Sequence, residues 1–218
     1  MPTADWAALF DWDGVMIDSA TAHERSWELL AEENRLPLPA DHFLRGFGMR
    51  NEVIIPNLLS WTRDPDRVRE LSLRKEELYR EVIRKEGVTV LPGVEPYLHS
   101  LRDAGIPAVI ATSTQRANVE HILDLTGLHP YFKDMVTSED VTRGKPDPDV
   151  FLKAARLASH PPANCVVFED ALHGIEAAKA AGMTAVGVLT THPGSRLIGA
   201  DLLVDRLDDL PLDGTRPV

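Results

Sequence analysis

Short apolar stretches that end at polar residues recur along this chain, and their spacing favours strands alternating with helices. The first stretch, Trp6–Phe10, stops abruptly at Asp11-Trp12-Asp13-Gly14. Apolar runs of this length without polar alternation are typical of parallel strands buried on both faces. Further strands are predicted over residues 107–112, 134–137, 165–168, 184–189 and 202–204, with helices over 115–126, 147–158 and 171–181.

The segment between the first strand and Leu91 shows helical spacing only. One predicted helix covers residues 19–34, and a second covers 64–86, where Asp64-Pro65 is typical of an N-cap followed by proline in the first turn. We therefore predict an α/β fold in which a Rossmann-like parallel-sheet core, residues 1–17 and 88–218, carries an inserted all-helical domain, residues 18–87. Residues 211–218 are expected to form a frayed tail.

Composition excludes several classes of protein. With 218 residues, 44% of them hydrophobic and 26% charged, the chain has the balance of a globular protein rather than a disordered one. The net charge of −11 should repel the phosphate backbone of nucleic acids. Residues 18–87 hold 12 basic and 14 acidic residues, a net charge of −2, so the rest of the chain carries −9.

No signal for a membrane or an oxidising compartment is visible. No apolar run reaches the length of a transmembrane helix, and the first ten residues lack a basic segment, so a cytoplasmic location is expected. Cys165 is the single cysteine, which excludes an intramolecular disulfide and a cysteine metal cluster. The seven histidines other than His23 show no metal-ligand spacing.

Polar residues follow the predicted strands at four places. They are, in chain order, Asp11 and Asp13, Thr112 and Ser113, Lys145 in the loop after the third strand, and Glu169 and Asp170. In an open parallel sheet, ligands bind beyond the carboxyl ends of the strands. Carboxylates, a lysine and a hydroxyl that converge there suit a hard divalent cation and a phosphoryl group.

Each of these residues also fits an ordinary structural role when taken alone. Asp13-Gly14 could form a simple turn, Asp170 could be the N-cap of the next helix, and Lys145 could be a solvated loop residue. Their joint occurrence at four strand ends favours the functional interpretation.

With these motifs, Asp11-Trp12-Asp13-Gly14-Val15, Thr112-Ser113, Lys145-Pro146-Asp147-Pro148 and Glu169-Asp170, the sequence resembles the haloacid dehalogenase (HAD) superfamily across essentially its whole length. The resemblance is to the phosphatase and phosphomutase branch, in which a helical cap is inserted after the first strand. An acid at the position of Asp13 is typical of transfer to and from oxygen, so dehalogenation is disfavoured.

The resemblance implies roles for the core residues. Asp11 would attack phosphorus and form an aspartyl-phosphate, and Asp13 would act as general acid and base. Lys145 would neutralise charge on Asp11 and on the phosphoryl group, and Thr112, Ser113 and Thr114 would bind phosphate. The implied cofactor is Mg²⁺, with the ligand set Asp11, the backbone carbonyl of Asp13, Glu169 and Asp170.

Candidate substrate contacts in the helical insert are less specific. His23, which lies ten residues after Asp13, and Arg50, in Gly46-Phe47-Gly48-Met49-Arg50, resemble substrate-binding positions of β-phosphoglucomutases. Lys75 falls near another such position. A helix-face histidine without a role is an equal alternative for His23, and a solvated charge on a strongly charged helix is the favoured interpretation of Lys75.

These observations predict a Mg²⁺-dependent phosphatase for a small phosphorylated metabolite, such as a sugar phosphate. A β-phosphoglucomutase-type mutase is the alternative, and residues 49–61 also resemble plant phosphatases of flavin synthesis. A non-catalytic binding module is disfavoured because both catalytic acids remain. The expected partner is the metabolite alone, with neither nucleic acid nor membrane, and a monomer is the default expectation for a sequence that says little about oligomeric state.

Overall fold

The computed structural model describes residues 4–46 and 49–218, apart from the side chain of Leu44. The chain divides into two compact units, which are Met1–Asp18 with Val90–Val218, here the core unit, and Ser19–Thr89, here the helical unit. Phe47 and Gly48, part of the motif predicted around Arg50, lie outside the described residues. None of the described helices is long and apolar enough to cross a membrane.

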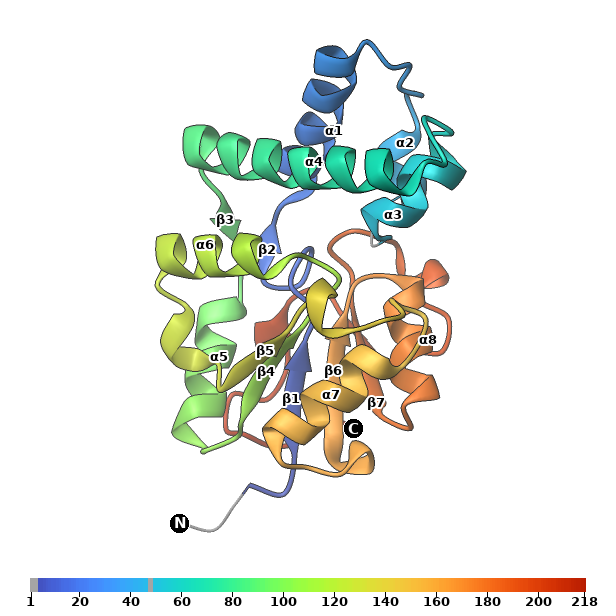
Figure 1. Ribbon diagram of the computed structural model, residues 1–218. Coiled ribbons are helices and arrows are strands. Elements are labelled where there is room, and N and C mark those ends of the chain that lie inside the picture. Colours follow the sequence, from blue (N-terminus) through green and yellow to red (C-terminus); the bar gives the residue numbers. More distant parts are fainter. Residues whose placement is uncertain (1–3, 47–48) are drawn as a thin grey trace. The chain divides into compact units, whose positions relative to one another are not determined.

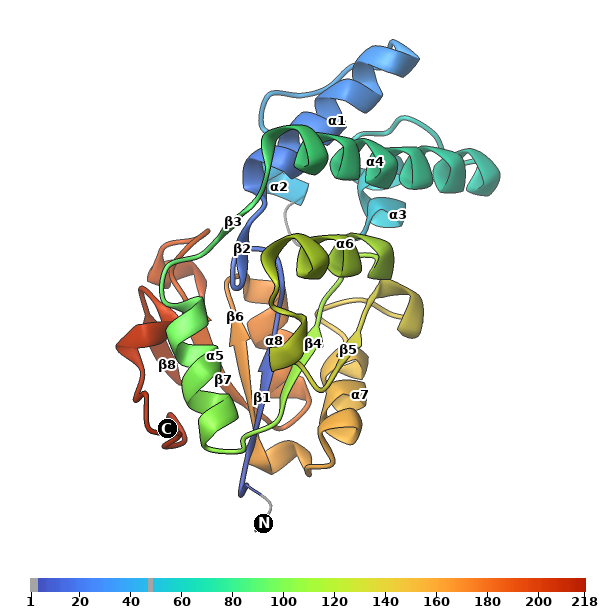
Figure 2. The ribbon, with the colours of Figure 1, turned by 90° about the vertical axis from the view of Figure 1, so that its left-hand side faces the viewer.

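The core unit is built on a six-stranded parallel sheet (Figures 1 and 2). Its order is β5-β4-β1-β6-β7-β8, and the bounds are β1 Ala7–Phe10, β4 Ala108–Ala111, β5 Asp134–Val136, β6 Cys165–Glu169, β7 Thr184–Val188 and β8 Leu202–Val204. β1 lies in the interior of the sheet, paired with β4 on one side and β6 on the other. The structure thus has every strand that the apolar runs predicted.

Alternate residues of the central strands face opposite layers of helices. Leu9 and Val167 contribute to a cluster with Phe151 and Ile175, which come from α7 (Asp149–Ala158) and α8 (Leu172–Ala180). Phe10 and Phe168 stack at 4.6 Å, and both contact Tyr97 of α5 (Val94–Asp103), so the other face is also covered. This burial on both faces explains why the strands are continuously apolar.

Other short elements complete the core unit. These are α6 (Arg116–Thr126), the 3₁₀ turns η2 (His129–Tyr131), η3 (Ser138–Asp140), η4 (Pro162–Asn164), η5 (Gly194–Arg196) and η6 (Leu207–Asp209), and the two-residue strands β2 (Ile17–Asp18) and β3 (Thr89–Val90). β2 and β3 pair where the chain leaves the core unit and returns to it.

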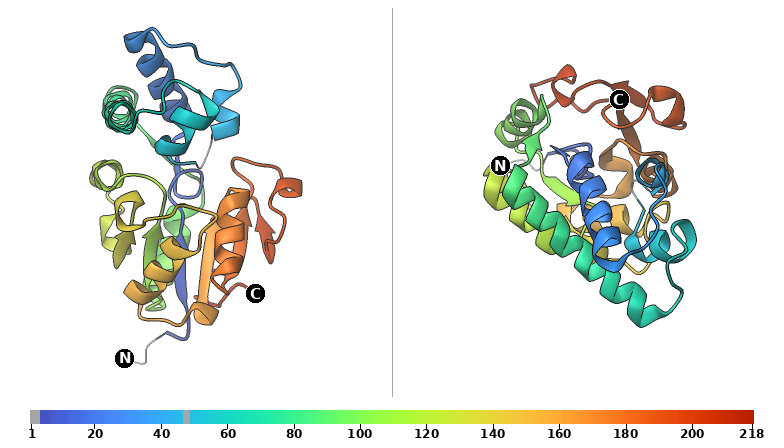
Figure 3. Two further views of the ribbon diagram at one scale, coloured as in Figure 1. Left: turned by 45° about the vertical axis from the view of Figure 1, so that its right-hand side comes forward. Right: turned by 90° about the horizontal axis from the view of Figure 1, so that it is seen from above.

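The helical unit consists of α1 (Ala20–Asn34), α2 (His42–Gly46), α3 (Asn51–Val53), the π-helical turn η1 (Ile54–Leu58) and α4 (Pro65–Glu86). α1 and α4 cross each other (Figure 3) and enclose an apolar core that includes Trp27, Leu30, Ile55 and Leu71. Arg74 of α4 also pairs with Glu33 of α1 at 2.7 Å. The α-helical periodicity of the two long predicted helices therefore marks the faces that pack together.

Two features differ from the sequence expectations. Helix α5 was not predicted, although Val94, Leu98 and Leu101 have helical spacing. Pro96 suggests a break there, but a proline in the first turn removes no helical hydrogen bond. The prediction of a frayed tail is wrong, because the indole nitrogen of Trp6 donates to the carbonyl of Gly214 at 3.2 Å and Arg216 donates to the carbonyl of Ala163 at 3.0 Å.

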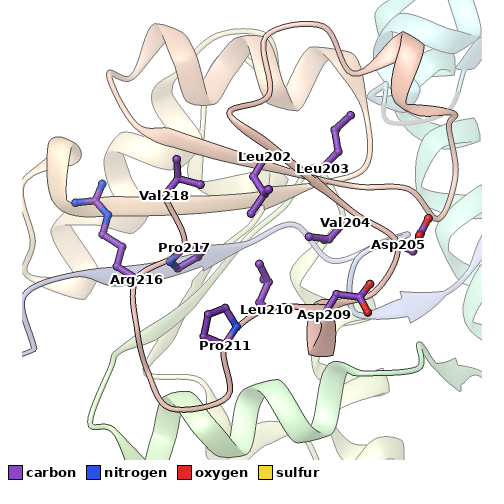
Figure 4. A pocket seen from close by; sticks show the side chains of 10 residues that line it. All are labelled: Leu202, Leu203, Val204, Asp205, Asp209, Leu210, Pro211, Arg216, Pro217 and Val218. Carbon is purple, nitrogen blue, oxygen red and sulfur yellow. The ribbon is translucent and has the colours of Figure 1, made fainter.

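The tail also closes one side of a cavity of about 560 Å³ beside the edge strand β8 (Figure 4). Leu202, Val204, Leu210 and Pro217 contribute to its apolar lining. None of the predicted site residues lines it, and β8 lies two strands away from β6. This cavity is therefore not the place where the sequence predicts chemistry.

The N-cap of α4 provides a test of the helical unit. Asp64 Oδ1 accepts a hydrogen bond of 2.9 Å from the backbone N–H of Arg67, as predicted. Asp64→Ala should lower the free energy of unfolding by about 1 kcal/mol in urea titrations. Asp66→Ala, in the same turn but not at the cap, should cost only about 0.3 kcal/mol through the helix dipole. Equal losses would contradict a capping role.

Candidate active site

β1, β4 and β6 lie side by side in the sheet of the core unit (Figure 2), and Asp11, Thr112 and Glu169 stand at their carboxyl ends. Asp11 continues β1, and its backbone N–H donates to the carbonyl of Phe168 at 3.0 Å, which ties it to β6. Glu169 is the last residue of β6, and Asp170 follows it. Strand pairing in register thus places two separate acidic motifs side by side.

Lys145 forms the centre of a buried ion cluster. Its Nζ atom lies 3.0 Å from Asp11 Oδ1 and 2.6 Å from Glu169 Oε1, and the Lys145 side chain is only 4% exposed. Glu169 uses its other oxygen to accept a hydrogen bond of 2.9 Å from the backbone N–H of Ala171. Glu169 is therefore held at both oxygens, while Asp11 faces the lysine from the adjacent strand.

Asp170 is the acid that this cluster leaves uncompensated. It is 1% exposed, and among the described residues the side chain of Thr191 is the one neutral group whose hydrogen bonding lowers its pKa, a contact too poorly aligned to satisfy either carboxylate oxygen. One oxygen each of Asp11, Glu169 and Asp170 lie within 4.8 Å of one another. A buried, unpaired carboxylate is costly, and three oxygens at this spacing suit a hard divalent cation. The residues present therefore fit Mg²⁺.

Electrostatics point to the same conclusion. Burial raises the pKa of Asp11 to about 7; Lys145 opposes this rise, whereas the charges of Glu169 and Asp13 add to it. Burial, Glu169 and Asp11 raise the pKa of Asp170 well above its ordinary value, and the Thr191 side chain and the charge of Lys145 only partly oppose this rise. Burial lowers the pKa of Lys145, but its two carboxylate neighbours outweigh that effect and raise it. One lysine thus does not compensate three buried acids.

Two glycines make room for these carboxylates. A Cβ atom on Gly14 would lie 2.0 Å from Asp170 Oδ2, and one on Gly174 would lie 1.8 Å from Glu169 Oε1. Gly14 also has a φ of +75°, a conformation that other residues rarely adopt. A side chain at either position would displace an acid of the cluster.

Asp13 and the residues after β4 form a second group. The hydroxyl of Thr114 donates to Asp13 Oδ2. Thr112, 2% exposed, accepts a hydrogen bond of 3.1 Å at its hydroxyl oxygen from the backbone N–H of Thr114. Its hydroxyl proton therefore remains available for donation to another acceptor. Ser113 stands between these two threonines.

In the helical unit, His23 and Lys75 contact each other. Lys75 Nζ lies 2.7 Å from His23 Nδ1 and 3.1 Å from Glu76 Oε1, and Asn51 donates to the same oxygen of Glu76 at 2.6 Å. Lys75 is 2% exposed, so its interpretation as a solvated charge is wrong.

Arg50 lies close to an acid of the same unit. Its Nε atom is 3.5 Å from Glu52 Oε2, and its side chain is 26% exposed. Arg50 is also the N-cap residue of α3.

Residues 7–182 match the sequence pattern of haloacid dehalogenase-like hydrolases. The chain belongs to this family. This membership confirms the resemblance to the HAD superfamily found in the sequence, the α/β fold class and the prediction that the protein is an enzyme.

Both phosphatases and mutases occur among the similar proteins. The 5-amino-6-(5-phospho-D-ribitylamino)uracil phosphatase of Arabidopsis thaliana chloroplasts is 38% identical over 208 residues, covering 94% of this chain and 55% of the plant protein. The HAD-family chain thus spans about half the length of that relative. The β-phosphoglucomutase of Bacillus subtilis is 35% identical over 213 residues, covering 95% of this chain and 92% of the mutase.

A solved structure shows the same fold. The family IA HAD hydrolase of Entamoeba histolytica superposes with a TM-score of 0.86 at 28% sequence identity, covering 96% of each chain.

One contact at the HAD-type site was missed in the sequence. The hydroxyl of Thr190, beyond β7, donates to the carbonyl of Gly14 and so holds the turn that follows β1. The sequence offered the same indication here as at the other strand ends, because the polar residues Thr190 and Thr191 directly follow an apolar run.

The fit of Mg²⁺ can be tested by thermal unfolding. Mg²⁺ should raise the melting temperature of the chelator-treated protein, because a ligand at a hundred times its Kd stabilises the folded state by about 2.7 kcal/mol. Asp170→Asn should remove most of this shift without lowering the melting temperature of the metal-free protein, since it removes a buried unpaired charge. The exposed-acid control Asp124→Asn should retain the shift. A full shift in Asp170→Asn would contradict the proposed ligand set.

A comparison with Gly182 separates two effects of Gly14, the space that it leaves for Asp170 and its left-handed backbone conformation. Gly182 has nearly the same φ, +73°, but a Cβ atom there would meet nothing within 4 Å. Gly182→Ala should therefore cost only the left-handed backbone strain, about 1–2 kcal/mol. Gly14→Ala should cost more and should also abolish the Mg²⁺-induced shift, because it displaces Asp170. Similar behaviour of the two variants would show that Gly14 serves the turn alone.

Proposed function

We propose that this chain is a Mg²⁺-dependent phosphatase that releases inorganic phosphate from a small phosphorylated sugar or polyol. The observation that carries the proposal is the packing of Lys145 between Asp11 and Glu169, beside the buried Asp170. Such a cluster can bring a phosphate dianion close to a carboxylate nucleophile only when cations compensate both charges.

Asp11 is the proposed nucleophile. Its carboxylate attacks phosphorus while the bond to the leaving oxygen breaks, and the resulting aspartyl-phosphate divides one slow displacement into two easier steps. Asp13 gives its proton to the leaving oxygen. It then takes a proton from the water that attacks the aspartyl-phosphate, so that Asp11 and inorganic phosphate are released.

The remaining core residues bind and neutralise charge. Lys145 compensates charge on Asp11 and on the phosphoryl group, and the hydroxyl proton of Thr112 and the backbone N–H of Ser113 donate to phosphoryl oxygens. Mg²⁺, held by Asp11, Asp170, the backbone carbonyl of Asp13 and the adjacent Glu169, would neutralise negative charge on the phosphoryl group when bound.

The substrate class rests on the relatives. The name of the Arabidopsis enzyme describes a phosphate ester on a ribityl chain, and that of the Bacillus enzyme a phosphosugar. Both are small phosphorylated molecules with several hydroxyl groups, so we expect a substrate of this kind. A cytoplasmic location and a monomeric state stay predictions.

A phosphosugar mutase is the second candidate. The β-phosphoglucomutase of Bacillus subtilis supports it, because that relative is 35% identical over 95% of this chain and 92% of its own length. In this case the helical unit acts as the predicted cap and contributes His23 and Arg50 to substrate binding. The two reactions share the phospho-enzyme and differ in whether water or a sugar hydroxyl takes the phosphoryl group.

A substrate panel tests the phosphatase. The wild-type protein should release phosphate from at least one member of a set containing 5-amino-6-(5-phospho-D-ribitylamino)uracil, sorbitol 6-phosphate and β-glucose 1-phosphate, and only with Mg²⁺. Asp11→Asn should reduce this rate about a thousandfold or more, because the nucleophile is lost. Asp5→Asn, an exposed acid before β1, is the control with the same change of charge and should retain the wild-type rate.

The same panel separates the two candidates. Conversion of β-glucose 1-phosphate to glucose 6-phosphate in the presence of a bisphosphate primer, without net release of phosphate, would establish the mutase instead. Equally slow turnover of every ester by wild type and Asp11→Asn would refute both.

A further inference from the structure

The contact between Thr114 and Asp13 joins two strand ends. Asp13 follows β1, and Thr114 follows the adjacent β4, 101 residues later in the chain. Thr114 is predicted from the sequence as a phosphate-binding residue, and in the structure its hydroxyl donates to Asp13 Oδ2.

Thr114 is well placed to hold another side chain because its own backbone is fixed. Its N–H donates to the hydroxyl oxygen of the buried Thr112 at 3.1 Å, and its carbonyl accepts from the N–H of Ser138 at 3.1 Å. Ser138 lies just beyond β5, so Thr114 is anchored to two strand ends and contacts a third.

Asp13 has a fixed backbone but a side chain that is only half-buried. The turn around it is closed by hydrogen bonds from Gly14 N–H to the carbonyl of Ile17 at 3.0 Å and from Met16 N–H to that of Trp12 at 2.9 Å. Those bonds do not restrict rotation about χ1, which has three staggered wells. An acid–base group must stay within hydrogen-bond reach of the proton it moves, so selection of one rotamer matters for the rate.

We propose that Thr114 is a positioning residue that holds the Asp13 carboxyl group in its acid–base orientation. This inference rests on the proposed function. A hydroxyl both donates and accepts, so Thr114 can donate to the carboxylate and accept from the protonated acid. The proton transferred to the leaving oxygen and later recovered from water is carried on the other oxygen, Oδ1, while Oδ2 stays in contact with Thr114.

The role predicts a dependence on the leaving group. Phenyl phosphate and p-nitrophenyl phosphate are nearly the same size, but phenol has a pKa of about 10 and needs protonation as it leaves, whereas p-nitrophenol is far more acidic. In rapid-quench measurements of the first turnover with Mg²⁺, Thr114→Val should slow release of phenol at least about tenfold and release of p-nitrophenol less than about twofold.

Three further variants control the measurement. Asp13→Asn should show the same selectivity in a stronger form, and Thr114→Ser, which restores the hydroxyl, should recover at least about a third of the wild-type rate on phenyl phosphate. Thr126→Val replaces a hydroxyl that bonds to the carbonyl of Ile122 within α6, and should leave both rates unchanged. Thermal unfolding of Thr114→Val and Thr114→Ser shows whether either variant has lost its fold.

The outcomes separate this inference from the proposed function. Equal losses by Thr114→Val on both esters would identify a phosphate-binding residue and overturn the positioning role, as would no loss on either. If Thr114→Val fails to fold, a folded Thr114→Ser with the wild-type ratio of the two rates supports the role, and an altered ratio overturns it. Absence of wild-type turnover of both aryl esters and of every ester of the substrate panel would refute the phosphatase, and the positioning role with it.

Discussion

The site depends on one interaction, the ammonium of Lys145 between the carboxylates of Asp11 and Glu169. Each of the three groups would be unstable in the interior alone, because a buried charge loses its hydration. Together they still leave Asp170 outside the ion pairs of the described residues, and its pKa is raised well above its ordinary value even though the charge of Lys145 lowers it. The core unit is therefore assembled around a deficit of positive charge that a divalent cation can satisfy, and an incoming phosphate dianion would need the same cation.

The rest of the core unit serves to keep these charges close. Pairing of β1 with β6 aligns Phe10 with Phe168, so the acids that follow the two strands emerge side by side. The apolar layers on both faces hold that register, and Gly14 and Gly174 remove the side chains that would push the acids apart. Packing, strand register and the two glycines thus all serve to keep these acids close together.

The helical unit contains a separate buried polar group, in which Lys75 lies between His23 and Glu76. In the proposed reaction the core residues act on the phosphoryl group whatever molecule carries it, and a phosphatase and a mutase would share that chemistry. The choice between water and a sugar hydroxyl therefore falls to residues that contact the rest of the substrate. The phosphatases and mutases among the relatives of this chain are consistent with one core chemistry serving several substrates.

The sequence by itself determined the parallel sheet, the two long helices of the insert and the list of polar residues at the strand ends, because these are recorded in local periodicity and in residues a few positions apart. Asp64 could be identified as a cap for the same reason. Only the tertiary structure decided that Lys75 is buried, that the tail packs against Trp6 and that Thr114 contacts Asp13. Those contacts join residues 52, 208 and 101 positions apart, and no local pattern specifies which distant side chain satisfies a given polar group.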